Sequence, residues 1–330
     1  MTPGTMNSGP CANGSTGEAT VVRRHVGEDG KRISYLAAGC TRAGNHPAIL
    51  LIHGTGVSAR SWTLQLQHLG RGLQVLALDL PGHGESDPIE RATLEGYADA
   101  AYSLLDALRT GPVFAAGHSL GGAVAQVLGA RHPEVVRGLA LLSTCAKLPE
   151  TDGRLQRLYR CLPGPIRKVL FLWMANKILF APSASRQAVS LGMEEILTCR
   201  PETTLKDVAA AQAMDLQELA QNLRVPTLIL CGDRDKVTPL ALADRLNELI
   251  PGSQLVIVKG AGHMLPLEAP GQVNRELLDF VRSVEPAEIH PAPSKSELRK
   301  RSILRRLIGK IAARFRRKRS PILHGTDSAS

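Results

Sequence analysis

Residues 117–121 of the chain have a spacing that suits nucleophilic catalysis by a serine. They read Gly-His-Ser-Leu-Gly, which has the form G-x-S-x-G, and they follow a short apolar run and precede a Gly- and Ala-rich segment. In this pattern the serine stands on a sharp turn from a strand into a helix, where only small residues two positions away avoid a clash. The pattern therefore predicts Ser119 as a nucleophile.

Candidates for an acid and a base follow this serine in the chain. A serine hydroxyl is a weak nucleophile near neutral pH, so it needs a base that is itself oriented by a carboxylate. The apolar run 227–231 leads into a turn that holds Asp233 and Asp235, and a later apolar run leads into a Gly-rich loop that holds His263. These residues predict a Ser-His-Asp triad with His263 as the base and one of the two aspartates as the acid.

The oxyanion of a tetrahedral intermediate needs two N–H donors. One is expected from the backbone amide of Leu120, directly after the predicted nucleophile. The second is expected from the loop at residues 51–56, which reads Leu-Ile-His-Gly-Thr-Gly, and there the amide of Thr55 is the best candidate. The sequence thus predicts an oxyanion hole made of two backbone amides, and no residue pattern indicates a cofactor or a metal site.

Short apolar runs alternate with helical patterns along most of the chain. Such runs are typical of strands buried on both faces, and their alternation with helices predicts an α/β fold with a mostly parallel central sheet flanked by helices. Residues 21–26 and 32–37 precede them and read as a hairpin. The predicted strands are residues 48–52, 75–78, 113–116, 139–142, 227–231 and 255–258, and the predicted helices include 61–69, 94–108, 122–131 and 240–249.

The alternation stops at residues 147–222, which contain helical patterns but no convincing strand. The strands predicted before this insertion and those predicted after it make a complete sheet only when they are taken together. Residues 21–146 and 223–284 are therefore expected to form one core. The insertion then reads as a helical cap after strand six. Its apolar stretches at 170–174 and 178–180 are expected either to form the core of the cap or to line an apolar pocket.

Five segments in this order resemble the α/β-hydrolase superfamily over about residues 21–284. The resemblance implies Ser119 as nucleophile, Asp235 as acid and His263 as base, with the cap where the family inserts its lid. Asp233 matches no catalytic position, and the alternative acid position after strand six, residues 143–146, holds no carboxylate. The matching segments are His53-Gly-Thr-Gly56, the run Asp79 to Ser86, Gly117 to Gly122, Gly232-x-x-Asp235 with Pro239, and Gly262-His263 followed by Glu268-x-Pro270.

Four further polar residues of these motifs are expected to be structural. His53, His83 and His118 stand at no catalytic position, and buried histidines often form hydrogen bonds with the backbone. Asp79 is expected to support the loop that follows its strand.

The composition is that of a folded soluble protein. Of the 330 residues 43% are hydrophobic and 21% are charged, and the six cysteines show no C-x-x-C pair, which favours a reducing cytoplasm. Residues 1–20 are rich in Gly, Ser, Thr and Pro, so they are expected to be disordered and to carry no secretory signal. No run of about eighteen apolar residues indicates a spanning helix.

The net charge of +10 is concentrated in the tail at residues 285–330. Residues 286–330 hold twelve Lys or Arg and three Asp or Glu, and the rest of the chain is nearly balanced. Residues 296–317 are predicted to form a cationic amphipathic helix, which fits an anionic membrane surface. There are two alternatives: the apolar face packs on the folded domain, or the helix binds a polyanion or a protein partner. Nucleic acid is the least expected partner, because the stretch has one aromatic residue.

These features together predict a serine hydrolase that forms an acyl-enzyme with a carboxylic ester, and the apolar cap and basic tail favour a lipophilic ester or lipid. Other chemistry of the same fold, namely carbon–carbon bond hydrolysis, acyl transfer or cofactor-free peroxidase activity, stays open. A non-catalytic binding protein recruited to membranes is the alternative of another class. The expected location is the cytoplasm or the inner face of a membrane, and the sequence predicts no oligomeric state.

Overall fold

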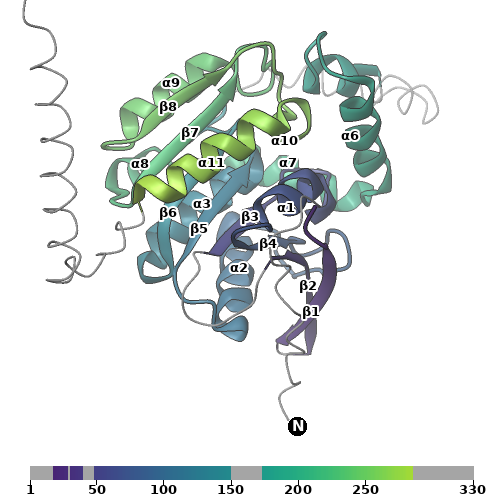
Figure 1. Cartoon of the computed structure of the whole chain (residues 1–330), viewed down its shortest axis with the longest axis vertical. Coiled ribbons are helices and arrows are strands. Elements are labelled where there is room, and N and C mark those ends of the chain that lie inside the picture. Colours follow the sequence, from purple (N-terminus) through teal and green to yellow (C-terminus); the bar gives the residue numbers. More distant parts are fainter. Residues whose placement is uncertain (1–17, 29, 40–47, 150–172, 285–330) are drawn as a thin grey trace, which may run out of the picture. The chain divides into compact units, whose positions relative to one another are not determined.

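The computed structural model describes residues 18–28, 30–39, 48–149 and 173–284, which form a sheet of eight strands with flanking helices (Figure 1). The strand order is β1-β2-β4-β3-β5-β6-β7-β8. Strands β3 to β8 pair in parallel, β1 and β2 form an antiparallel hairpin, and β2 pairs antiparallel with β4. The mostly parallel sheet predicted from the apolar runs is confirmed. The strands are β1 (Val22–Glu28), β2 (Lys31–Ala38), β3 (Ala48–Ile52), β4 (Gln74–Leu78), β5 (Val113–His118), β6 (Val136–Leu142), β7 (Thr227–Gly232) and β8 (Gln254–Val258).

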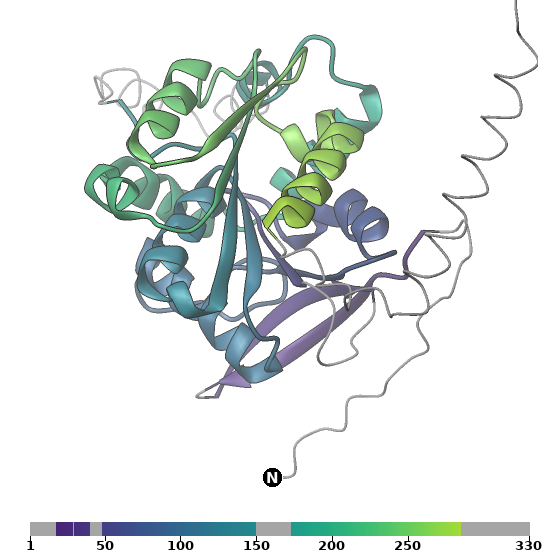
Figure 2. The same cartoon turned by 60° about the vertical axis from the view of Figure 1, so that its left-hand side comes forward.

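The helices cover both faces of this sheet (Figure 2). Strand β3 shows why both faces are apolar, because Leu50 and Ile52 point into one core cluster while Ile49 and Leu51 point into the other. Helices α2, α3, α8 and α9 pack on the first face, and α1 and α11 pack on the second. The helices are η1 (Ala59–Trp62), α1 (Thr63–Leu69), α2 (Leu94–Leu108), α3 (Leu120–Arg131), η2 (Pro133–Val135), α6 (Arg186–Thr198), α7 (Pro201–Ala213), α8 (Gln217–Asn222), α9 (Leu240–Leu249), α10 (Leu265–Glu268) and α11 (Pro270–Val284).

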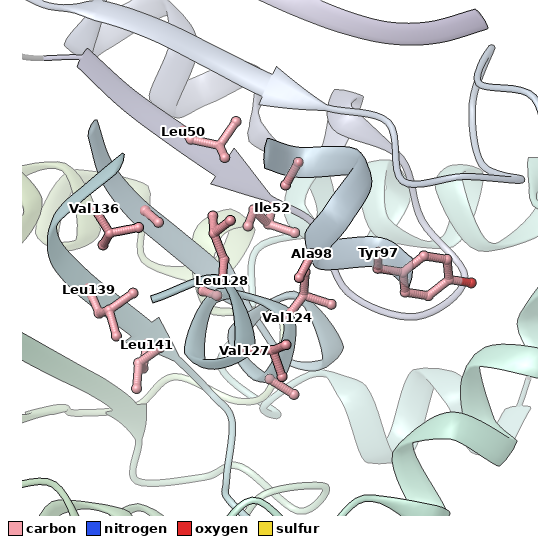
Figure 3. Packing of buried hydrophobic residues seen from close by; sticks show 14 of the residues in the cluster. Leu50, Ile52, Tyr97, Ala98, Val124, Val127, Leu128, Val136, Leu139 and Leu141 are labelled. Atoms are coloured by element: carbon pink, nitrogen blue, oxygen red, sulfur yellow. The ribbon is translucent and has the colours of Figure 1, made fainter. Parts of the chain in front are cut away.

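Helix α3 lies in the middle of the larger core cluster and is buried almost all round. Figure 3 shows Val124 and Leu128 of this helix in one cluster with Ile52 of β3 and Leu139 of β6. Its glycines let it approach the sheet closely, since a Cβ added at Gly122 would lie 2.5 Å from a side-chain carbon of Thr144. Close packing fixes the N-terminus of α3, which is where the predicted nucleophile stands.

Between β6 and β7 the described residues add helices and no strand to the sheet, which agrees with the helical insertion predicted after strand six. Residues 173–179, α6, α7 and α8 make up this part. Helix α8 packs on α3 and α9, and Leu216 and Ala220 are buried in the core cluster, so we assign α8 to the core. Trp173 and Met174 are exposed, so these two residues do not form the core of the cap.

Three predictions fall wholly or partly outside the described ranges. They are the amphipathic helix at 296–317, most of the N-terminal segment 1–20, and residues 150–172 of the predicted cap with the first part of the apolar stretch 170–174. Of the N-terminal segment residues 18–20 are described, and there the amide of Ala19 donates to the Gln67 carbonyl at 3.0 Å, so this part is held against α1. In the described part of the chain, no helix has the length and apolar character needed to cross a membrane.

Candidate active site

Ser119 stands in the turn between β5 and α3. Its φ of 53° is a left-handed conformation that residues other than glycine rarely adopt. The flanking glycines are required by close backbone contacts. A Cβ at Gly117 would lie 2.1 Å from the Gly121 carbonyl oxygen, and one at Gly121 would lie 2.2 Å from the carbonyl oxygen of Ile52. The strained turn leaves the Ser119 side chain partly exposed at the carboxyl edge of the sheet.

The structure brings together the three side chains predicted as a triad. Nε2 of His263 lies 3.0 Å from Oγ of Ser119. On the other side of the ring, Nδ1 of His263 lies 2.9 Å from Oδ2 of Asp235. Asp235 follows β7 and His263 follows β8, so the parallel strands place these residues beside Ser119 at one edge of the sheet. Such a chain of hydrogen bonds can accept the proton of the serine hydroxyl.

Asp235 is held as a carboxylate by its surroundings. Its Oδ1 accepts the backbone amides of Val237 and Thr238 at 2.8 and 2.9 Å, and its Oδ2 accepts the Thr238 hydroxyl at 2.9 Å. Burial raises the pKa of Asp235, but the hydrogen bond and charge of His263, together with the Thr238 donors, outweigh it and bring the pKa to about 2. Asp233 points elsewhere, because its Oδ1 accepts the Gly260 amide at 2.7 Å.

The loop that carries His263 is fixed by contacts on both sides. The carbonyl oxygen of His263 accepts a hydrogen bond of 2.7 Å from Nε2 of His118, the residue directly before Ser119. Burial lowers the pKa of His118 to about 3, so the ring is neutral at neutral pH. Glu268 accepts the amides of Gly262 and Met264 at 3.0 and 3.1 Å. The contacts of Glu268 explain why this residue follows the Gly262-His263 pair at a short distance in the sequence. The contact of His118 helps to hold the loop of His263 in position.

The two amides predicted for the oxyanion hole belong to segments that meet beside Ser119. Leu120 is the first residue of α3. The first N–H groups of a helix have no hydrogen-bond partner within the helix, so they are available to other acceptors. The loop with Thr55 passes close to Ser119, since a Cβ at Gly54 would lie 3.0 Å from the Cβ of Ser119. That these two amides form an oxyanion hole stays a prediction.

Asp79 and His53 have structural surroundings, as the sequence predicts. Asp79 is fully buried, pairs with Arg23 and accepts the amide of Ala59 at 2.8 Å. His53 accepts the amide of Leu80 on Nε2 at 3.0 Å, and burial lowers its pKa to about 4. Both side chains join the loops after β3 and β4, and neither contacts the triad through a hydrogen bond among the described residues.

Two buried carboxylates of the inserted helices were not predicted from the sequence. Asp207 of α7 lies 2.9 Å from Nε2 of His83 and accepts the hydroxyl of Tyr97 at 2.7 Å. Glu195 of α6 accepts the amide of Ser58 at 3.1 Å. These contacts attach the inserted helices to the loops after β3 and β4. Acidic residues on helices usually face solvent, so the sequence carries no signal that marks these as buried.

The described part of the chain holds no group of three or more His, Cys, Asp or Glu side chains arranged to bind a metal ion.

A nucleophile turn, a hydrogen-bonded histidine and a buried aspartate on this sheet topology are the features of an α/β hydrolase. Residues 49–276 match the alpha/beta hydrolase family, and the chain belongs to this family and is a hydrolase.

The relatives of the chain include esterases. It is similar to the pimeloyl-(acyl-carrier protein) methyl ester esterase of Chromobacterium violaceum, with 30% identity over 249 residues that cover 73% of this chain and 94% of that protein. A thermophilic esterase of known structure shares 31% identity at a TM-score of 0.68, covering 81% of this chain and all of its own. A thermophilic esterase from Thermogutta terrifontis, with malate bound, shares 26% identity at a TM-score of 0.68 over 81% of this chain and 100% of its own.

Proposed function

We propose that the protein hydrolyses a carboxylic ester through an acyl-enzyme on Ser119. The observation that carries the proposal is the continuous chain of hydrogen bonds from Asp235 through His263 to Ser119, with distances of 2.9 and 3.0 Å. The similarity to esterases supports an ester as the bond that is cleaved.

In the first half of the reaction, Oγ of Ser119 attacks the ester carbonyl carbon while Nε2 of His263 takes the hydroxyl proton. The carbonyl oxygen becomes an oxyanion that accepts hydrogen bonds from the amides of Thr55 and Leu120. His263 then gives the proton to the leaving alcohol, and the acyl group stays on Ser119. Asp235 stabilises the imidazolium and does not itself take the proton.

In the second half, water takes the place of the alcohol. His263 removes a proton from the water, which attacks the acyl carbon and forms a second oxyanion in the same hole. Collapse of this intermediate breaks the bond to Ser119, the proton returns to Oγ, and the carboxylic acid leaves. No cofactor enters these steps.

We further propose a lipophilic ester as the substrate and a peripheral location at the cytoplasmic side of a membrane. The basic composition of residues 286–330 supports the location, because clustered Lys and Arg are attracted to anionic lipid. The exposed apolar residues of the inserted helices support a lipophilic substrate.

The experiment is a substrate panel of esters, thioesters, vinylogous diketones and peracid, with alcohols as acyl acceptors, measured for the unchanged chain and for Ser119→Ala. We expect the highest kcat/KM for an ester and a loss of at least about 10³-fold in kcat for Ser119→Ala. Ser143→Ala is the matched control, because Ser143 is buried near the site and its hydroxyl has no hydrogen-bond partner in the described part of the chain.

Three outcomes would contradict the proposal in different ways. Ester turnover that survives Ser119→Ala within about tenfold would exclude the serine mechanism. A preference for a diketone, an alcohol acceptor or a peracid would assign another reaction of the same fold. An unchanged chain that turns over nothing in the panel and binds no serine-directed probe would favour a non-catalytic binding protein.

A further inference from the structure

Residues 173–179 of the insertion present three large apolar side chains to solvent. Trp173, Met174 and Ile178 are 60%, 39% and 37% exposed, whereas Ala175 of the same helix is buried. At about 100° per residue, the three exposed side chains lie within an arc of about 140° on this helix, and the exposed Lys177 lies inside the same arc. We call these three residues the rim patch. A soluble protein rarely leaves a tryptophan and two large aliphatic side chains together in water unless they meet a partner.

The rim patch is attached directly to the loop of the catalytic histidine. The carbonyl oxygen of Leu179, at the end of the helix, accepts the backbone amides of His263 at 2.9 Å and of Met264 at 3.1 Å. A Cβ at Gly262 would lie 2.6 Å from the Ala181 amide nitrogen, so the two segments touch through their backbones. Any surface that binds the rim patch therefore lies close to the triad.

Two cations lie at the rim patch, namely Lys177 on the same helix and Lys236, which bonds to the backbone of that helix. The ammonium of Lys236 donates to the carbonyl oxygen of Lys177 at 3.0 Å, and the hydroxyl of Ser183 donates to the Gly260 carbonyl at 2.6 Å, so three chain segments meet here. These segments, residues 173–186, 233–236 and 257–260, contain two carboxylates. Asp235 is buried and bonded to His263, and Asp233 is partly exposed. The exposed cations of residues 173–186, 233–236 and 257–260 are Lys177, Arg186, Arg234, Lys236 and Lys259.

We propose that the rim patch inserts into the surface of an anionic lipid bilayer. Tryptophan favours the boundary between the apolar and the wet part of a bilayer, and flanking Lys and Arg are attracted to anionic headgroups. A second copy of the chain suits this face less well, since a two-fold contact would bring the same cations against each other. The proposal goes beyond ester hydrolysis, because lipid binding needs no serine nucleophile, and it concerns residues other than the basic tail.

The two tryptophans of the chain make the test direct. Trp62 is fully buried and Trp173 is exposed, so a change of emission on lipid binding reports on Trp173. The full-length Ser119→Ala protein is mixed with vesicles of phosphatidylcholine alone or with phosphatidylglycerol, and with vesicles that carry brominated acyl chains. We expect a blue shift and bromine quenching with the phosphatidylglycerol vesicles only, and neither in Trp173→Phe.

Substitutions in the full-length chain separate the contribution of Trp173 to vesicle binding from that of the two lysines. Trp173→Ala is expected to weaken vesicle binding. Lys177→Gln combined with Lys236→Gln is expected to weaken it roughly ten- to thirtyfold, because each basic residue near such a surface contributes about 1 kcal/mol. Val22→Ala is the control, since Val22 is also exposed, at 43%, but belongs to the edge strand β1.

Three results would overturn the proposal. Vesicle flotation with an unchanged Trp173 spectrum would assign binding to the tail alone. Equal shifts with and without phosphatidylglycerol would remove the role of the cations. A blue shift in buffer that grows with protein concentration and tracks a dimer in sedimentation would assign the rim patch to a second copy of the chain. Because the readout is made on Ser119→Ala protein, none of these outcomes depends on ester hydrolysis.

Discussion

Replacing Asp235 by asparagine tests whether the carboxylate sets the proton position on His263. Oδ1 of Asp235 accepts the amides of Val237 and Thr238, and Oδ2 faces Nδ1 of His263 at 2.9 Å. In Asp235→Asn the amide oxygen is expected to keep the two backbone donors, which turns the NH₂ group toward Nδ1. His263 then carries its proton on Nε2, faces Ser119 as a donor and cannot accept the serine proton.

The expected loss is about 10⁴-fold in kcat, since a wrongly protonated histidine leaves only the oxyanion hole and substrate binding to act. This corresponds to about 5.5 kcal/mol of transition-state stabilisation. KM should stay within about threefold, because Asp235 is buried behind His263 and makes no contact expected to bind substrate. The assay is steady-state hydrolysis of a p-nitrophenyl ester, with circular dichroism to verify the fold.

Asp233→Asn is the matched control. Asp233 is two positions away, but its side chain is 32% exposed and bonds to the Gly260 amide rather than to His263. Its kcat should stay within about threefold of the unchanged chain. The reasoning is refuted if Asp235→Asn keeps more than a tenth of the activity, or if Asp233→Asn loses as much as Asp235→Asn.

Four further predictions follow from the same contacts. His118→Phe removes the bond to the His263 carbonyl, and kcat measured on a chromogenic ester should fall roughly ten- to hundredfold while KM changes less. Gly121→Ala places a Cβ against the Ile52 carbonyl, so thermal unfolding should show a loss of about 1–3 kcal/mol or failure to fold. Asp207→Ala leaves buried His83 and Tyr97 without their partner, and urea unfolding should show a loss of about 3–5 kcal/mol. The pKa of Asp235 is lowered from 3.8 to about 2 in the folded state. Its ionisation therefore stabilises the fold above about pH 4, and unfolding at decreasing pH should show about 2 kcal/mol of this stability lost between about pH 4 and pH 2, but not in Asp235→Asn.

The sequence predicts the parts of the site that depend on short-range rules. The turn at Ser119 needs small neighbours whatever the rest of the chain does, so the glycines at 117 and 121 reveal it. Asp235 and His263 each follow an apolar run, and parallel strands bring their carboxyl ends to one edge of the sheet. His263 accordingly lies within hydrogen-bonding distance of both Ser119 and Asp235.

The features that the sequence did not predict depend on contacts between segments that are far apart in the chain. Asp207 and Glu195 are buried because distant loops supply donors to them, and nothing in the helical pattern around each distinguishes them from solvated acids. Trp173 belongs to an apolar stretch that reads as buried, yet it is exposed because the helix turns this face away from the core. Residues 217–222 were predicted as part of the cap, but as helix α8 they pack on α3 and α9 of the core. Contacts between segments this far apart in the sequence leave no local pattern.

The position of the acyl group after a single turnover tests the proposed mechanism most directly. The chain would be mixed with a p-nitrophenyl ester, quenched in acid within one turnover, and analysed by intact and peptide mass spectrometry. The mechanism predicts a mass increase equal to one acyl group on the peptide with Ser119, and no such increase in Ser119→Ala. An acyl group on another residue, or release of the acid at an unchanged rate by Ser119→Ala, would contradict it.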